Sequence, residues 1–341
     1  MWCMKRSCDK EIKVIKAERF REVAGERSWP YPFEEALLEL LKNENPWEQE
    51  YYYIEDGTQY ALFVLYRMRL NIFTFGKFCL KLPVKVIGYP CSLSEAGYLT
   101  NSKELLLRYV REMKGANLVL NATEPEAAEG FTVGETLPTC VFYNRFATSE
   151  QYLASLRSSY RRRVKKALSA CADFTVEEWD GKTDIYALYL STYEKSDYKL
   201  ERLERGFFEQ VEGVRLVFSH KEEARGFVLL RQVEDTLIFM LCGMDYRYET
   251  ADLYYFMIYT ILEYGMKQGC RRIDLGQTSE ETKLKFGAVL EKRYFYAHHS
   301  NPFLNGLVKL GKSLLAYHYK FPEYRVYLEG KHESTVTETG I

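Results

Sequence analysis

The sequence lacks the features that would place the chain across a membrane or outside the cell. It has no run of about 18 uncharged apolar residues, the length that a spanning helix needs. Its first twenty residues carry charges throughout and hold no apolar segment of the kind that a secretory signal requires. The eight cysteines show no CxxC pair or other metal-ligand spacing, and Cys79, Cys140 and Cys242 lie within apolar, β-rich runs. We therefore expect a cytoplasmic protein with reduced thiols and no metal site.

The sequence also lacks an excess of charge of one sign. Its 47 basic and 48 acidic residues give a formal net charge of −1, so no global charge indicates a nucleic-acid or membrane partner. The hydrophobic content of 47% is that of an ordinary globular protein. A chain of 341 residues is long enough for two domains, because single cores rarely grow beyond about 250–300 residues.

The stretch from Thr236 to Ala288 has the clearest pattern in the chain. A β-rich apolar run at 237–244 is followed by Thr250, a good helix N-cap, and by an apolar periodic segment at 253–264. Gly269 is placed to end that helix, and the alternating residues at 272–275 predict a second strand. The pattern predicts a right-handed βαβ unit with parallel strands. Its helix is apolar almost all round, so we expect cover on more than one side.

The end of this stretch resembles a known family. The motif consists of Asp274, Gly276, Lys283, Phe286 and Gly287. It is similar to the closing D-hydrophobic-G and K-x-x-F-G pattern of the Fem-type acyltransferases, which belong to the GNAT superfamily and commonly contain two GNAT-like domains in tandem. The order of the elements upstream also fits, over roughly residues 30–310.

The resemblance implies an α/β (α+β, GNAT-like) fold with two tandem lobes, each a mixed, mainly antiparallel sheet flanked by helices. We expect an N-terminal lobe at 1–147, a basic junction helix at 148–170, a C-terminal lobe at 171–325 and a polar tail at 326–341. In the first lobe, the pattern predicts helices at 34–41 and 102–114 and strands at 51–54, 60–68, 70–80, 84–89, 117–120 and 139–146. In the second lobe, it predicts helices at 184–195 and 203–212 and strands at 174–179, 214–219 and 226–232, with the last strand at 293–299.

The junction helix carries a dense group of cations beside an apolar stripe. The cations are Arg157, Arg161, Arg162, Arg163, Lys165 and Lys166. Six cations over about three turns repel one another, so solvent, carboxylates of the protein or an anionic ligand has to offset them. A solvated face with contacts to carboxylates is one interpretation. Phosphate binding by Arg161, Arg162, Lys165 and the more distant Lys285 is another, and nucleic-acid binding is a third.

GNAT enzymes bind the donor's pyrophosphate in a glycine-rich loop before the long helix, and this chain departs from that loop. Residues 245–251 occupy its position and contain no glycine. Residues 245–252 contain three carboxylates (Asp245, Glu249 and Asp252) and a single basic residue, Arg247. The carboxylates repel a diphosphate. The resemblance implies that the donor arm lies here, with Gly243, Arg247 and Tyr248 as donor-binding candidates. Several Fem-type members lack this loop and take their acyl group from an aminoacyl-tRNA.

The candidate catalytic residues are Lys283, Asp274 and Tyr246. The motif places Lys283 near the reaction centre, where its charge would offset the tetrahedral intermediate or hold a phosphate. The alternative is a solvated loop lysine beside two glutamates. Asp274 at a strand end would orient the loop or accept a proton, or only make a hydrogen bond at the end of the strand. Tyr246 would protonate a leaving group, or only pack or contact the rim of the site.

These candidates together predict an acyltransferase that moves an acyl or aminoacyl group, from acyl-CoA or aminoacyl-tRNA as co-substrate, to an amine of an anionic acceptor. No bound cofactor is expected. The family implies a bacterial enzyme acting on peptidoglycan or other envelope precursors, or on metabolite amines, with tRNA as a possible partner. The rival hypothesis is a non-catalytic ligand- or RNA-binding protein that keeps the fold. An amphipathic helix predicted at 304–321 either docks on its lobe or contacts a membrane surface.

Overall fold

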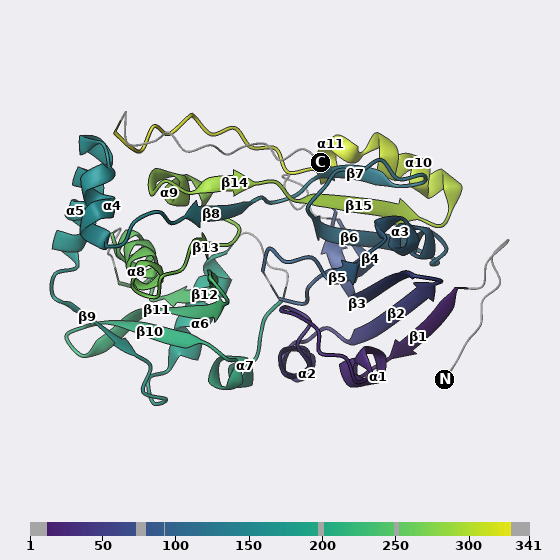
Figure 1. Cartoon of the computed structure of the whole chain (residues 1–341), viewed down its shortest axis with the longest axis horizontal. Coiled ribbons are helices and arrows are strands. Elements are labelled where there is room, and N and C mark those ends of the chain that lie inside the picture. The colour runs from purple at the N-terminus through teal and green to yellow at the C-terminus, as the bar shows by residue number, and fades with distance from the viewer. Residues whose placement is uncertain (1–11, 73–79, 92, 197–200, 249–251, 329–341) are drawn as a thin grey trace. The chain divides into compact units, whose positions relative to one another are not determined.

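The computed structural model describes residues 12–72, 80–91, 93–196, 201–248 and 252–328. The chain divides into two compact units (Figure 1). The first comprises Met1–Thr139, Tyr193–Glu212 and Glu291–Tyr319, and the second comprises Cys140–Thr192, Gly213–Leu290 and Lys320–Ile341. This division differs from the expected sequential boundaries at 147, 170 and 325, because later segments of the chain return to the first unit.

The first unit is a mixed sheet flanked by helices. Its strands are β1 (Lys13–Ala17), β2 (Gln49–Asp56), β3 (Gln59–Asn71), β4 (Lys81–Ile87), β5 (Tyr98–Thr100), β6 (Ala116–Ala122), β7 (Thr132–Glu135) and β15 (Tyr294–His299). Its helices are α1 (Phe20–Ala24), α2 (Glu35–Asn43), α3 (Lys103–Arg111), α7 (Arg205–Gln210), α10 (Pro302–Leu310) and α11 (Lys312–Leu315). A tight turn joins β2 to β3, and Gly57 has the positive φ of +64° that such a turn requires. Residues 73–79 of the strand expected at 70–80 lie outside the described residues.

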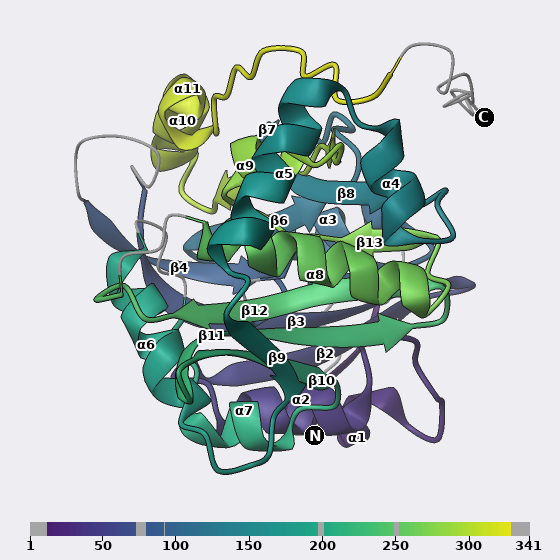
Figure 2. The same cartoon turned by 90° about the vertical axis from the view of Figure 1, so that its left-hand side faces the viewer.

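The second unit is also a mixed sheet with helices on both faces. Its strands are β8 (Thr139–Tyr143), β9 (Phe174–Glu178), β10 (Val214–His220), β11 (Glu223–Val233), β12 (Thr236–Met244), β13 (Arg272–Asp274) and β14 (Val289–Glu291). Its helices are α4 (Ser149–Ser155), α5 (Ser158–Ala170), α6 (Ile185–Lys195), α8 (Leu253–Lys267) and α9 (Glu280–Lys285). Helix α8 lies across the sheet, and α5 crosses over α8 (Figure 2).

The predicted βαβ unit is confirmed. Strands β12 and β13 are parallel and are joined through α8, which ends before Gly269 at a φ of +69°. Thr250, the expected N-cap, lies outside the described residues, and α8 begins after Asp252. As its apolar surface predicted, α8 contacts β11 on one side and α4 and α5 on another.

The two sheets have the same strand order. The first runs β1-β2-β3-β4-β6-β15-β7, with β5 beside β3, and the second runs β9-β10-β11-β12-β13-β8-β14. In each sheet an antiparallel meander leads to a parallel pair, β4–β6 or β12–β13, whose connection contains α3 or α8. This repeated arrangement confirms the predicted fold class of two tandem, mixed and mainly antiparallel lobes.

The closing strands belong to the opposite sheets from those expected. Residues 293–299 were expected to close the second lobe, but β15 pairs with β6 and β7 of the first sheet. Strand β8, expected in the first lobe, pairs with β13 of the second. Tyr296 of β15 is fully buried in the first core, and Phe142 of β8 in the second. The expectation was therefore wrong, because burial against non-adjacent strands and not order in the chain decides which sheet each strand completes.

The predicted junction helix is two helices. Thr148 caps α4 by accepting the N–H of Gln151, as a capping box predicts, but the chain is extended at Leu156 and Arg157 before α5 begins. The break accommodates the segment around Val326, because the backbone N–H of Arg157 donates to the backbone oxygen of Val326 at 2.9 Å. The helix expected at 304–321 is likewise divided, into α10 and α11.

Candidate active site

The parallel strands β12 and β13 are paired over a short stretch only. The register ends where Ile238 lies opposite Asp274; β13 stops there, whereas β12 continues to Met244. A β-bulge interrupts the pairing of β12 with β11 between Phe239 and Leu241, and bulges bend the strand that contains them. The ladder between the two strands therefore ends at Asp274, and we call this end of the pairing the separation of β12 and β13.

On its other side β13 stays attached to β8 beyond this point. Leu275 donates its backbone N–H to the Cys140 oxygen at 2.8 Å, and Cys140 donates to the Gly276 oxygen at 3.0 Å. The separation therefore lies between β12 and β13 alone. Strands that separate leave backbone groups on their facing edges without a ladder partner, and such groups bind whatever donor or acceptor reaches them.

The loop after β13 has an unusual backbone. Gly276, Thr278 and Ser279 all have positive φ, at +70°, +61° and +51°. A β-branched threonine in this region is strained, and such strain persists only where neighbouring contacts impose it. One such contact comes from Asp274, whose Oδ1 accepts the Gly276 N–H at 2.8 Å. Asp274 thus orients the loop, one of the two roles expected of it.

Lys283 supplies the second contact that holds this loop. It lies in α9 with 2% of its surface exposed, which contradicts the alternative of a solvated lysine. Its Nζ donates to the backbone oxygens of Gly276 at 3.2 Å and Gln277 at 2.8 Å. An ammonium has three N–H groups, so one remains for a further acceptor. Burial lowers the pKa of Lys283, against the opposing effect of nearby thiols and carboxyls.

The thiols of Cys140 and Cys242 lie near Lys283, and the phenol of Tyr254 lies near both thiols. Burial raises the pKa of Cys140 to about 12 and that of Cys242 to about 11, so both stay protonated at neutral pH. Burial also raises the pKa of Tyr254, which is hydrogen-bonded to Ser279 and influenced by both thiols. Their grouping could not be detected from sequence, because they come from β8, β12 and α8.

The last two motif residues also have structural roles. Phe286 is fully buried, and its backbone oxygen accepts the Tyr152 hydroxyl at 2.9 Å. Gly287 has a φ of +92°, and the phenol of Tyr327 occupies the space that a side chain would need. Asp274 and Lys283 therefore hold the loop after β13, whereas Phe286 and Gly287 pack the end of α9 against Tyr152 and Tyr327.

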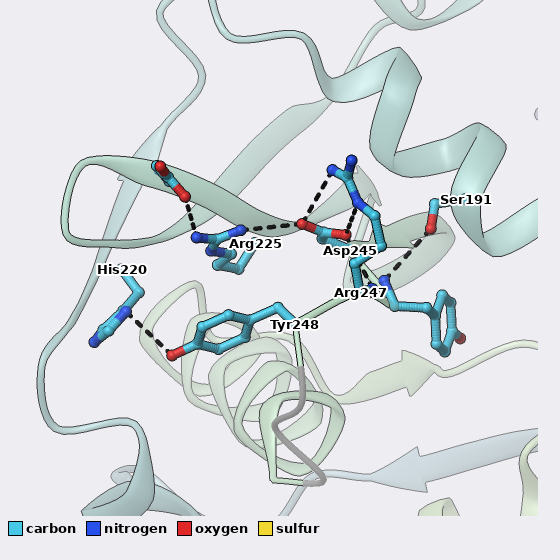
Figure 3. Close-up of polar contacts among 8 residues, drawn as sticks. Ser191, His220, Arg225, Asp245, Arg247 and Tyr248 are labelled. Carbon is cyan, nitrogen blue, oxygen red and sulfur yellow. Dashed lines mark hydrogen bonds and ion pairs between the residues drawn. The ribbon is translucent and has the colours of Figure 1, made fainter.

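The segment after β12 is an ion-paired cluster (Figure 3). Asp245 is buried, and its carboxylate accepts hydrogen bonds from Arg225 at 3.0 Å and Arg247 at 2.9 Å. The hydrogen bond from Arg247 is the main cause of a lowered pKa at Asp245. Tyr248 lies beneath the guanidinium of Arg225, 4.5 Å from ring centroid to carbon, and its hydroxyl lies 3.1 Å from Nδ1 of His220. Arg247 and Tyr248 therefore already have partners within the protein.

Gly243 and Tyr246 lie where β12 meets α6. A Cβ atom on Gly243 would come within 2.5 Å of the backbone of Leu188 and Tyr189, so the glycine admits the close approach of α6. The backbone N–H of Tyr246 is directed at the Ser191 hydroxyl at 3.4 Å (Figure 3), and its side chain is 45% exposed. Burial of the phenol raises the pKa of Tyr246, and Cys242 adds to this effect.

The predicted phosphate-binding residues are spread over α5 and α9. Arg162 and Lys165 are exposed on α5, and Arg161 is half-buried. Lys285 pairs with Glu281 at 2.7 Å and lies over the ring of Tyr324. The residue that attaches α5 to α8 is instead Arg163, which sequence analysis did not select. Its guanidinium pairs with Asp252 at 2.5 Å and lies 3.7 Å from the centroid of Tyr255.

Among the residues that the structure describes, no group of three or more histidine, cysteine or acidic side chains is placed to hold a metal ion. Within the same part of the chain, no helix is long and apolar enough to cross a membrane.

Comparison with known proteins identifies the fold of the second unit. Residues 154–284 match the family model described as an acetyltransferase (GNAT) domain. No curated protein matches the chain. Residues 154–284 are therefore similar to a GNAT acetyltransferase domain.

Solved structures similar to the chain include FemX, with 12% identity and a TM-score of 0.45 over 79% of this chain and 92% of that one. L-PGS from Bacillus licheniformis has 11% identity and a TM-score of 0.46 over 76% and 87% of the two chains. A tandem GNAT protein from the clavulanic acid biosynthesis pathway has 10% identity and a TM-score of 0.41 over 74% and 83%.

Proposed function

We propose that this chain moves an acyl or aminoacyl group, from acyl-CoA or aminoacyl-tRNA, to an amine of an anionic acceptor such as a cell-envelope precursor. The observation that carries the proposal is the separation of β12 from β13 beside the buried ammonium of Lys283. In this reaction the amine nitrogen attacks the donor carbonyl, and an oxyanion forms on the carbonyl oxygen. The intermediate collapses as the thiolate, or the tRNA hydroxyl oxygen, leaves and the nitrogen loses its proton.

The donor carbonyl is best accommodated along residues 239–244 of β12. Backbone N–H groups alternate between the two edges of a strand, so part of this segment faces β11 and part faces the side from which β13 has departed. At the far end, the Met244 N–H is taken by the Thr192 hydroxyl at 2.9 Å. The N–H groups before Met244 are therefore the ones we assign to the donor.

Lys283 is assigned to the developing oxyanion. Two of its N–H groups donate to backbone oxygens, which fixes the position of the ammonium. The third N–H group can then donate a hydrogen bond to the oxyanion as it forms. A cation acts more strongly in such a buried place than in water. Tyr246 retains its proton at neutral pH because its pKa is raised, which suits a group that protonates a departing thiolate or alkoxide.

The ion pairs of Asp245 and Asp252 are a reason to test acyl-CoA as the donor first. The sequence suggested that Asp245, Glu249 and Asp252 would repel a diphosphate, and Glu249 lies outside the described residues. Asp245 is paired with two arginines and Asp252 with Arg163, so these carboxylates are offset within the protein. The exposed Arg162 and Lys165, with the half-buried Arg161, are the cations that we assign to the anionic acceptor.

The experiment follows thiol release from acyl-CoA, and transfer from aminoacyl-tRNA, in the presence of envelope-precursor amines. Removing one oxyanion donor typically lowers turnover by about 10²–10³-fold, so Lys283→Met should lose that much. Lys267→Met is the matched control, because Lys267 is an exposed lysine of α8 in the same unit that pairs with Glu263 at the surface. Unchanged turnover in Lys283→Met would reject the assigned role.

The exposed cations of α5 favour a second candidate, non-catalytic RNA binding. For an RNA ligand held by Arg162, Lys165 and Lys166, the logarithm of the binding constant would fall linearly with the logarithm of the salt concentration, with a slope set by the number of phosphates contacted. A steep slope with no consumption of either donor would support this candidate over acyl transfer.

A further inference from the structure

Helices α10 and α11 of the first unit expose an unusual number of large apolar side chains. The most exposed are Phe303 (74%), Leu310 (84%) and Leu314 (60%), followed by Leu307 (49%) and Leu304 (41%). Four of them, at 303, 307, 310 and 314, recur at intervals of three or four residues, which places them on one side of a helical path. We call Phe303, Leu307, Leu310 and Leu314 the α10–α11 stripe.

The stripe does not belong to the protein core. The two helices attach to the first sheet through Val308 and Leu315, which pack against Phe295, Ala297 and Ala316. Helix α10 contacts β15 and α11 contacts β7, and neither helix contains a fully buried residue (Figure 1). Contiguous exposed apolar surface of this kind marks a site of interaction with another molecule or with a lipid surface.

The charged side chains of α10 and α11 are all basic. Residues 294–322 contain no aspartate or glutamate, although the whole chain has 48 acidic residues in 341. The same stretch contains Lys309, Lys312 and Lys320, each of which is exposed. A second copy of the chain placed face to face on this stripe would bring the lysines of the two copies' helices close together. An anionic lipid surface offers an apolar interior and negative headgroups at once.

We propose that the α10–α11 stripe lies on an anionic lipid bilayer. The side chains of the stripe enter the boundary between headgroups and acyl chains, and Lys309 and Lys312 meet the headgroup phosphates. The helices lie in the plane of the surface, as amphipathic interfacial helices do. The proposal rests on exposure and charge and does not depend on the acyl-transfer reaction.

The test is co-sedimentation of the intact chain with vesicles of phosphatidylcholine and phosphatidylglycerol at 70:30, and with pure phosphatidylcholine vesicles. We expect binding to the anionic vesicles that weakens as salt is added. Leu310→Ser with Leu314→Ser should lower the partition coefficient by about ten-fold or more, because the inserted apolar area is lost. Lys309→Gln and Lys312→Gln should each lower binding to the anionic vesicles by about five-fold and leave binding to neutral vesicles unchanged.

The matched control is Leu82→Ser, which removes a leucine of 41% exposure from β4 of the same unit. It should bind as the wild type does. Absence of binding to the anionic vesicles, or equal loss in the control, would overturn the proposal. So would a dimer in sedimentation velocity that the stripe variants dissociate, because the stripe would then be covered by a second copy of the chain.

Discussion

Replacement of Gly243 by alanine separates two roles that this residue could have. The sequence made it a donor-binding candidate, whereas the structure gives it a packing role. A Cβ at this position would lie 2.5 Å from the Leu188 carbonyl carbon, the Tyr189 backbone nitrogen and a ring carbon of Phe227. Two of these atoms belong to the backbone of α6, so the helix itself has to move.

The expected cost follows from that geometry. Overpacking of this kind costs about 1–3 kcal/mol. The alanine recovers about 0.5–1 kcal/mol, because it restricts the unfolded chain more than glycine does. We therefore expect Gly243→Ala to lose about 1–2 kcal/mol of stability, which lowers the melting temperature of a domain of this size by roughly 2–8 °C.

The assay is urea unfolding together with hydrogen exchange, which should show faster exchange in α6 and β12. Gly306→Ala is the control, because Gly306 lies inside α10 with no atom within 4 Å of the added Cβ. It should be neutral or stabilise the protein by up to about 1 kcal/mol. If Gly243→Ala unfolds as the wild type does but loses its affinity for the acyl donor, the packing argument is refuted and the donor role stands.

Three further predictions concern the same unit. The free energy of unfolding of the wild type should rise relative to that of Lys283→Met as the pH rises through the lowered pKa of Lys283 towards the ordinary value of 10.5. In this range the unfolded chain binds more protons than the folded chain. Parallel profiles of unfolding free energy against pH for the two proteins would contradict this prediction. Arg163→Met should lower the free energy of unfolding by about 1–2 kcal/mol. A double-mutant cycle with Asp252→Asn should give a coupling energy of at least about 0.5 kcal/mol, and strictly additive effects of the two substitutions would show that the ion pair contributes nothing. Tyr152→Phe should lower the free energy of unfolding in urea by about 1–2 kcal/mol, because the buried Phe286 oxygen loses the hydrogen bond from the Tyr152 hydroxyl. An unchanged unfolding midpoint would show that this hydrogen bond does not contribute to stability.

The elements that could be predicted from sequence are those specified by neighbours in the chain. The periodicity of α8, the glycine that ends it and the alternation in β13 are local signals, and the structure confirms them. The exchanged positions of β8 and β15 could not be predicted in the same way. The partners of β15 lie about 170 residues earlier in the chain, and local pattern does not distinguish one sheet from the other.

The candidate site shows the same limit. The motif identified Lys283 and Asp274, but the burial of the lysine and its two carbonyl acceptors depend on how the loop folds back. The break between α4 and α5 depends on a segment near Val326, and the need for Gly243 depends on α6. These are long-range contacts, so residue type and spacing alone could not assign the roles.

The central claim is that the donor's acyl group lies at the separation of β12 and β13 beside Lys283. The most direct measurement is photo-cross-linking of the intact chain with a diazirine-bearing acyl group, carried on coenzyme A and on tRNA, followed by mapping of the labelled peptides. The account predicts label within 239–244 or 276–283 for at least one carrier, with competition by the unmodified donor. Labelling confined to other segments, or labelling that the unmodified donor does not reduce, would contradict it.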